Sequence, residues 1–300
     1  MAKELSPSQS GARGVRRIAR KEIARALKAL GAKNISDEEV HAARRRLKKA
    51  RAALRLLRDV LGKARYTREN TALRDAARPL SEMRDARVLL DTLDGLVERY
   101  GATVRILQLD RLRRTLRRGQ IARRRSVLGR PGALKPQYRE LRKLHKRAGR
   151  WPVGRKGWSV LGPCLKKVYA KGRKARAAAQ TRSPEALHEW RKQAKYLRAQ
   201  WQILRPLRPA LIGELTRQAH ELTDSLGEDH DLLMLRAQAL QNTSAFSRST
   251  DRTELVALID RCRTELEDRA MIVGRRLYAE KPGKFERRFG RYWWDWRGGA

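Results

Sequence analysis

The sequence predicts an all-α protein made of two antiparallel helical bundles. Composition, helical periodicity and an internal repeat lead to this prediction. Ala, Leu, Arg, Lys and Glu dominate the 300 residues, and runs of strand-favouring residues are hard to find. Hydrophobic residues make up 41% of the chain, enough for a core, and the length suggests two domains of about 150 residues each.

Helix signals in the first half appear in a regular order. Apolar residues three to five positions apart predict a helix over 14–30, which Gly31 ends. Ser36 and Glu39 have the spacing of a capping box and begin a second helix that runs to about Leu61. Three more helices are expected over 67–80, 84–100 and 102–128, with Pro79 ending or kinking the first of these.

Glycines and prolines after residue 128 break the helical pattern. We therefore expect a first bundle over 1–130, a linker over 131–157 and a second bundle over 158–300, with a short helix possible at 138–146. The second bundle is expected to contain helices over 158–180, 184–204, 209–225, 229–240 and 251–279. Ser183 and Pro184 give a start signal for the second of these helices.

The second half repeats the first at an offset of 147 residues. VHAARRRLKKARAALRLL, from Val40, aligns with LHEWRKQAKYLRAQWQIL, from Leu187, and a second window aligns Asp85 with Asp231 at nearly the same offset. Two windows in the same order indicate an internal duplication. The aligned cationic pairs are His41 with His188, Arg44 with Arg191, Arg45 with Lys192, Lys48 with Lys195, and Arg51 with Arg198.

The charge of the chain indicates an anionic partner. Lys and Arg number 72 against 32 Asp and Glu, a formal net charge of +40. Self-repulsion of this size destabilises a compact state, and a partner of opposite charge is the usual reason that it persists. Nucleic acid, an anionic membrane and polyphosphate are the candidate partners.

The repeated helix has the geometry of a phosphate ladder. At about 100° per residue, its cations share one stripe and its apolar residues the opposite one, and 41–58 contains no acidic residue. Cations one turn apart, about 5.4 Å, can follow a chain of phosphates. The predicted binding residues of this helix and its second copy are His41, Arg44, Arg45, Lys48, Arg51 and Arg55, then His188, Arg191, Lys192, Lys195 and Arg198.

The histidines and the other basic helices leave alternatives open. Neighbouring cations disfavour protonated His41 and His188, which would then donate a neutral N–H to phosphate or pack between helices. The basic helix over 111–125 extends the site, contacts nucleic acid or is a solvated face. The first helices of the two halves can face the same groove through Arg13, Arg17 and Arg20, and through Lys167, Lys171 and Lys174.

These residues resemble the CHAD family, the histidine-containing α-helical domain. Its pattern of His, Arg at +3 and basic residues at +7 and +10 occurs twice, starting at His41 and at His188. The resemblance covers nearly the whole chain and implies two bundles related by a pseudo-twofold axis. It also implies that basic helix faces bind inorganic polyphosphate, and that the protein associates with polyphosphate granules.

We therefore expect non-catalytic polyphosphate binding, with nucleic-acid binding as the alternative and no cofactor. Phosphate hydrolysis or transfer is a weaker third hypothesis, because no converging carboxylates for Mg²⁺ and no common catalytic motif are visible. Residues 228–231 mix metal-ligand types but point in different directions on a helix; Asp229 is expected to cap that helix, and Asp85 and Asp231 to pair with cations.

Three further expectations concern location and packing. No signal peptide or membrane span is apparent, so the expected location is the cytoplasm. Cys164 and Cys262 are expected to be packed thiols. The aromatic tail over 285–296 is expected to dock onto the second bundle in preference to stacking on bases.

Overall fold

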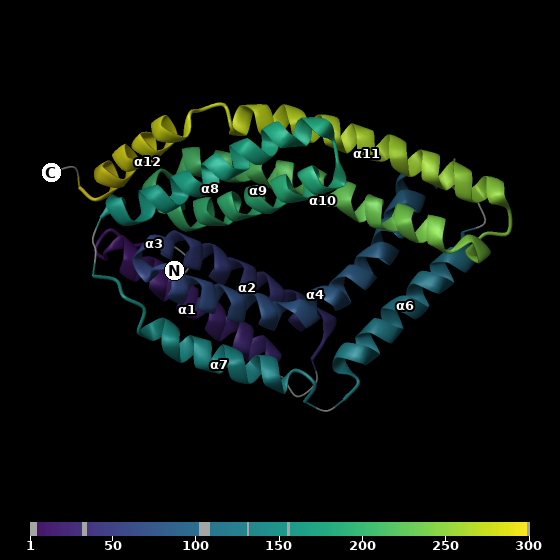
Figure 1. Ribbon diagram of the computed structural model, residues 1–300, viewed down its shortest axis with the longest axis horizontal. Coiled ribbons are helices and arrows are strands. Elements are labelled where there is room, and N and C mark those ends of the chain that lie inside the picture. Colours follow the sequence, from purple (N-terminus) through teal and green to yellow (C-terminus); the bar gives the residue numbers. More distant parts are fainter. Residues whose placement is uncertain (1–4, 32–34, 102–108, 131, 155–156, 299–300) are drawn as a thin grey trace. The chain divides into compact units, whose positions relative to one another are not determined.

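The computed structural model describes residues 5–31, 35–101, 109–130, 132–154 and 157–298, and these ranges contain helices and no strand, which confirms the all-α class (Figure 1). The α-helices are α1 (Gly11–Leu30), α2 (Asp37–Leu56), α3 (Arg58–Leu61), α4 (Lys63–Arg99), α6 (Asp110–Leu128), α7 (Lys135–Gly149), α8 (Trp158–Ala178), α9 (Pro184–Leu204), α10 (Pro209–Gln241), α11 (Ser249–Leu277) and α12 (Pro282–Trp296).

The two helices that carry the histidines begin where the sequence predicts. Ser36 and Glu39 form the expected capping box: the Ser36 hydroxyl accepts from the Glu39 amide at 3.2 Å, and the Glu39 carboxylate accepts from the Ser36 amide at 2.8 Å. In α9 the Ser183 hydroxyl accepts from the amide of Ala186 at 3.3 Å, and Pro184 occupies the first turn. These caps fix the first turns of α2 and α9.

Two predicted gaps between helices, at 81–83 and 226–228, are wrong, because α4 and α10 are continuous. Pro79 lies inside α4, and α10 runs through the expected gap at 226–228. A proline inside a helix costs about 3 kcal/mol. The buried stripe of α4 nevertheless continues past Pro79 at helical spacing, through Leu73, Ala76, Leu80 and Met83, so side-chain packing offsets the local cost. Of the helix expected over 102–128, residues 102–108 lie outside the described residues.

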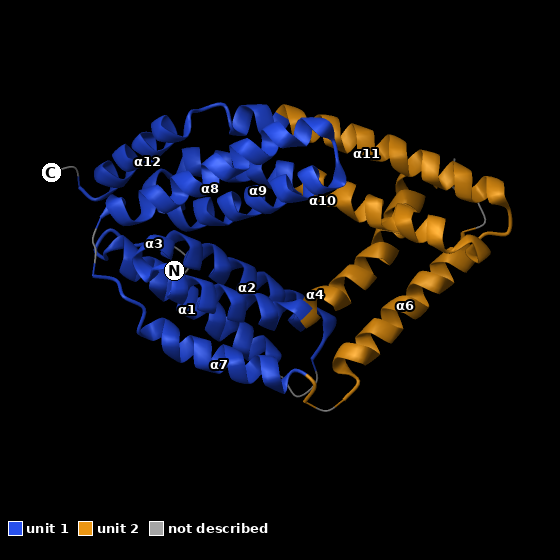
Figure 2. Ribbon diagram, in the orientation of Figure 1, with its two compact units in different colours: residues 1–78, 134–223, 273–300 blue, residues 79–133, 224–272 orange. Residues whose placement is uncertain are grey.

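The chain forms two compact units, and each draws segments from both halves of the sequence (Figure 2). Unit 1 comprises 1–78, 134–223 and 273–300, and unit 2 comprises 79–133 and 224–272. The division therefore does not follow the expected bundles over 1–130 and 158–300. The expected linker over 131–157 contains α7, a helix whose Leu141, Leu144 and Ala148 are buried.

In unit 1, α1 packs on α2 and α7, α8 packs on α9 and α12, and α2 lies against α9. Aromatic side chains hold α8, α9 and α12 together, with the rings of Tyr169 and Phe285 stacked at 3.9 Å. Trp293 is buried, and its ring centroid lies 6.1 Å from that of Trp158. The aromatic tail therefore docks on the helices of the second sequence half, although Trp294 is 62% exposed.

Helix starts in unit 1 recur at the offset predicted from the sequence. Gly11 starts α1 and Trp158 starts α8; Asp37 starts α2 and Pro184 starts α9; Lys135 starts α7 and Pro282 starts α12. Each second start comes 147 residues after the first. This regularity agrees with the expected duplication, while the pseudo-twofold relation stays a prediction.

Unit 2 has a leucine-rich core of its own. Its fully buried members include Leu93, Leu112, Leu235, Leu255 and Ile259, from α4, α6, α10 and α11. Beside it, buried Asp229 accepts a hydrogen bond from Arg263 Nε at 2.9 Å. Asp229 lies inside α10, so its expected role as a helix cap is wrong.

Both cysteines are buried free thiols, as expected. Within the described ranges, no helix is long and apolar enough to cross a membrane.

Candidate polyanion-binding site

The α2 helix separates cations from apolar residues as its sequence predicts. His41, Arg45 and Lys48 are exposed, and Arg44, Arg51 and Arg55 are half-buried. The opposite side is buried through Ala43, Leu47, Ala50, Leu54 and Leu57. These apolar residues fix the orientation of α2 in unit 1, so its cations line the other side.

The α9 helix has the same arrangement. His188 and Lys192 are exposed, and Arg191, Lys195 and Arg198 are half-buried. Its buried side is formed by Trp190, Ala194, Leu197, Trp201 and Leu204. Because α2 lies against α9, the two cationic helices meet within unit 1.

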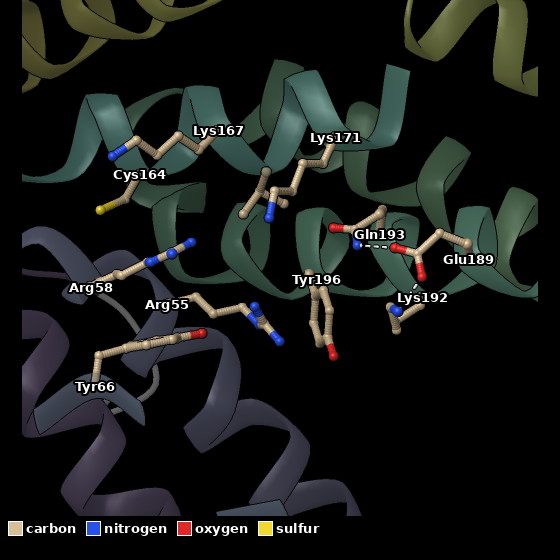
Figure 3. A pocket seen from close by; sticks show the side chains of 11 residues that line it. Arg55, Arg58, Tyr66, Cys164, Lys167, Lys171, Glu189, Lys192, Gln193 and Tyr196 are labelled. Carbon is tan, nitrogen blue, oxygen red and sulfur yellow. Dashed lines mark hydrogen bonds and ion pairs between the residues drawn. The ribbon is translucent and has the colours of Figure 1, made fainter. Parts of the chain in front are cut away.

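A pocket of about 260 Å³ opens where these helices meet α8. Four predicted binding residues line it: Arg55, Lys167, Lys171 and Lys192. The other lining residues are Arg58, Tyr66, Cys164, Val168, Glu189, Gln193 and Tyr196. Figure 3 shows the side chains of Arg55 and Arg58 reaching from one side toward Lys171 and Tyr196 on the other.

Two tyrosines hold the arginines of the pocket. The Arg55 guanidinium carbon lies 3.7 Å from the centroid of the Tyr196 ring, and that of Arg58 lies 5.3 Å from the centroid of the Tyr66 ring. Such cation–π contacts stabilise a guanidinium by about 0.5–2 kcal/mol and leave its N–H edge available for an anion. They therefore orient cations that would otherwise repel one another.

Two lysines of the pocket are paired with carboxylates of the same chain. Lys167 Nζ lies 2.7 Å from Asp59 Oδ2, and Lys192 forms an ion pair with Glu189. Burial alone would raise the pKa of Glu189, but hydrogen bonds from Lys192 and Gln193 outweigh it and hold that pKa below its usual value. Glu189 is thus an ionised internal competitor of any anion that binds here.

The surroundings of His188 disfavour its charged form. Partial burial, followed by the positive charges of Arg191, Lys192 and Lys195, lowers the pKa of His188 below its ordinary value of 6.5. This lowering of the pKa agrees with the neutral imidazole that the sequence predicts. Both His188 and His41 are exposed on their helices, so packing between helices is not their arrangement. Contact of either residue with phosphate stays a prediction.

The basic residues of α1 are not brought to this pocket. Arg17 donates to the Gln9 side chain at 3.1 Å, and Arg20 lies beside α7, where its positive charge contributes to lowering the pKa of His145. Arg13 and Lys174 are exposed but do not line the pocket. Of the six residues predicted on the first helices of the two halves, only Lys167 and Lys171 of α8 line the pocket.

The two tyrosines, Glu189 and Gln193 line the pocket but were not predicted from the sequence as residues of the site. Tyr196 is next to Lys195 on α9, but its role depends on how α9 packs against α2. Tyr66 comes from α4, outside the compared repeat windows. Glu189 gave the clearest signal, because it places a carboxylate beside His188 in the second copy, where the first copy has Ala42.

Comparisons with known proteins agree with this architecture. The family model described as the CHAD domain matches residues 8–240. The solved structure of PptA from Streptomyces chartreusis is similar with a TM-score of 0.66 at 16% identity, covering 91% of this chain and 100% of that one. The crystal structure of the CHAD domain from the plant Ricinus communis is similar with a TM-score of 0.64 at 17% identity, covering 93% of this chain and 96% of that one. No curated protein matches the sequence.

Proposed function

The chain belongs to the CHAD family, and from this premise we propose that the basic surface of unit 1 binds inorganic polyphosphate without turning it over. The observation that carries the proposal is the pocket where α2, α3, α8 and α9 converge. Arg55, Arg58, Lys171 and Lys192 reach it from separate helices. Only a ligand with several negative charges can engage all of them, and a phosphate chain meets that requirement.

The cations of α2 extend this binding surface beyond the pocket. His41, Arg45 and Lys48 are exposed along the helix at one-turn spacing. A polyphosphate chain held in the pocket can continue along this row. Short phosphates occupy fewer of these positions, so we propose that affinity increases with chain length.

We propose binding without catalysis, because the potential reactive groups of the pocket are poorly suited to chemistry. Burial raises the pKa of the Cys164 thiol to about 11, so it stays protonated and is a weak nucleophile. The Glu189 carboxylate is engaged by Lys192 and Gln193. Incubation with polyphosphate is expected to release no phosphate, whereas release that scales with protein concentration would show an enzyme.

Removing cations from the pocket tests the proposed site. The variant R55Q/K171Q/K192Q is expected to lose at least about tenfold in polyphosphate affinity at physiological salt, since three charge-assisted contacts of about 1 kcal/mol each are removed. The matched control R139Q/R142Q/R291Q loses the same charge from exposed positions on α7 and α12. Equal affinities of the two variants would place the site elsewhere.

We also propose that the protein lies in the cytoplasm and associates with polyphosphate granules. A fluorescent fusion should then coincide with polyphosphate staining in cells, and R55Q/K171Q/K192Q should become diffuse.

A further inference from the structure

The α6 helix of unit 2 is a second strongly basic element, separate from the pocket of unit 1. Its sequence, DRLRRTLRRGQIARRRSVL, contains eight arginines and no lysine. Leu112 and Leu116 are buried in the leucine core of unit 2, and this packing sets which side of the helix is outward. The exposed arginines are Arg111, Arg114, Arg117, Arg118, Arg123, Arg124 and Arg125.

Most of this positive charge is not neutralised within the described part of the chain. Arg113 pairs with Asp94 at 2.8 Å, and Arg123 lies 3.6 Å from Glu82. Arg114, Arg117, Arg118 and Arg125 have no carboxylate partner among the described residues. At about 100° per residue these four arginines share one side of α6. Their mutual repulsion is relieved if an anion binds there.

The distribution of arginines around α6 indicates which class of anion this helix can bind. From residue 117 onward the helix is exposed on nearly all sides, and Arg117, Arg118, Arg123, Arg124 and Arg125 spread over more than half of its circumference. A single phosphate chain contacts one side of a helix. The major groove of B-DNA, about 12 Å wide, admits a helix of about 10–12 Å and presents phosphates on both sides of it.

The use of arginine in place of lysine and the lack of an exposed apolar side on α6 also favour binding in the major groove. Guanidinium groups bind phosphate oxygens in pairs and also reach guanine edges in the major groove. A helix that lies on a membrane needs an apolar side. Leu112 and Leu116 of α6 are buried in the core, and Ile121, at 60% exposure, is the one large exposed apolar side chain among the described residues of this helix.

We propose that α6 binds double-helical DNA in the major groove, independently of the polyphosphate site in unit 1. The protein is then a two-ligand adaptor: unit 1 holds polyphosphate, and α6 holds duplex DNA.

Removing charge from α6 alone tests this proposal. In R114Q/R117Q/R118Q/R125Q, glutamine keeps the helix propensity and removes four phosphate contacts. The affinity for a short mixed-sequence DNA duplex at about 0.15 M salt is expected to fall at least about tenfold. The slope of log affinity against log salt should become shallower by about 3 to 4. Polyphosphate affinity should change less than about threefold, and circular dichroism should confirm an unchanged fold.

Matched variants separate this site from overall charge and from the proposed function. R139Q/R142Q/R287Q/R291Q removes the same formal charge from exposed positions of α7 and α12 and should keep its DNA affinity within about threefold. R55Q/K171Q/K192Q should lose polyphosphate but keep DNA. Equal DNA losses in the α6 variant and the control would overturn the proposal. So would equal binding of duplex RNA, whose deep, narrow major groove does not admit side chains.

Discussion

At the residue scale, most cations that line the pocket of unit 1 already contact internal partners. Tyrosine rings hold Arg55 and Arg58, and carboxylates hold Lys167 and Lys192. An entering phosphate chain has to replace the carboxylates, whereas the rings can remain in place. Asp59 and Glu189 are therefore expected to weaken binding and the two tyrosines to support it.

Replacing Glu189 with glutamine is expected to raise polyphosphate affinity by about two- to fivefold, because the substitution removes an exposed ion pair that competes with phosphate. Titration with fluorescent polyphosphate measures the change. E214Q is the matched control: the pKa of Glu214 is lowered to about 2 by Arg217 and Gln218, and its loss changes the charge equally outside the pocket. An affinity increase no larger than that of E214Q would show that Glu189 does not compete.

The lowered pKa of His188 predicts a pH dependence. In the free protein the group is neutral at pH 7, and its contribution to the free energy of unfolding falls as pH drops from 6.5 through the lower folded-state pKa. Bound polyphosphate favours the protonated form, so affinity is expected to rise over the same window. H188Q should remove that part of the rise, whereas H145Q, on α7 beside Arg20, should retain it. Identical profiles for both variants would exclude His188 from the site.

The sequence predicted which cations face outward but not which of them meet. The 3.6-residue period was sufficient to place Arg55 and Lys192 on outward stripes. That Arg55 lies over Tyr196, or that Arg20 lies beside α7, depends on contacts between helices far apart in sequence. No local pattern contains this information.

At the element scale, local signals were reliable for helix starts and unreliable for breaks. Ser36 and Ser183 cap their helices as predicted, because a cap is a local set of hydrogen bonds. The helix before Pro79 was expected to stop near residue 80, but α4 continues through 81–83, since the buried stripe on both sides of Pro79 stabilises the continuous form. Tertiary packing decides such cases.

Close contact between α8 and Tyr278, the residue that follows α11, gives a prediction for Gly172. A Cβ atom there would lie 2.5 Å from the hydroxyl oxygen of Tyr278, whose ring is buried. G172A is expected to lower the free energy of unfolding by about 1–3 kcal/mol, because overpacking exceeds the gain in helix propensity. Urea denaturation measures the change.

Gly119 in α6 is the matched control for that substitution. No atom of the described residues lies within 4 Å of a Cβ atom built there, so G119A is expected to stabilise its helix by about 0.5–1 kcal/mol. If G172A were as stable as the unchanged protein, the packing of Tyr278 against α8 would have to be revised.

At the scale of the whole molecule, the compact units are interleaved along the chain. Unit 1 combines 1–78 with 134–223 and 273–300, and its helix starts recur at the predicted offset. The sequence predicted the fold class and that offset. It did not predict the units, because a contiguous division at 131–157 assumed that glycines and prolines mark a domain boundary. The same segment contains α7, whose buried leucines pack into unit 1.

The net charge of +40 predicts that salt raises the Tm of the free protein and reduces the increase in Tm that polyphosphate causes. Salt screens self-repulsion, so the Tm of the free protein should rise with NaCl. Polyphosphate is expected to raise Tm by binding the folded state, and salt should weaken that binding. The two Tm curves, measured by scanning calorimetry, should therefore converge as salt increases. If the Tm curves of the free and the bound protein stayed parallel as salt increased, polyphosphate binding would not depend on the positive charge of the protein.

Competition at about physiological salt, where the Debye length is roughly 8 Å, shows whether unit 1 binds polyphosphate selectively. Purified protein is loaded with long-chain fluorescent polyphosphate and challenged with excess double-stranded DNA and with RNA. We expect polyphosphate to stay bound, because the pocket cations of unit 1 select it and DNA binds to α6 instead. Ready displacement of polyphosphate by either nucleic acid would show that unit 1 is a general phosphate-binding surface and not a selective site.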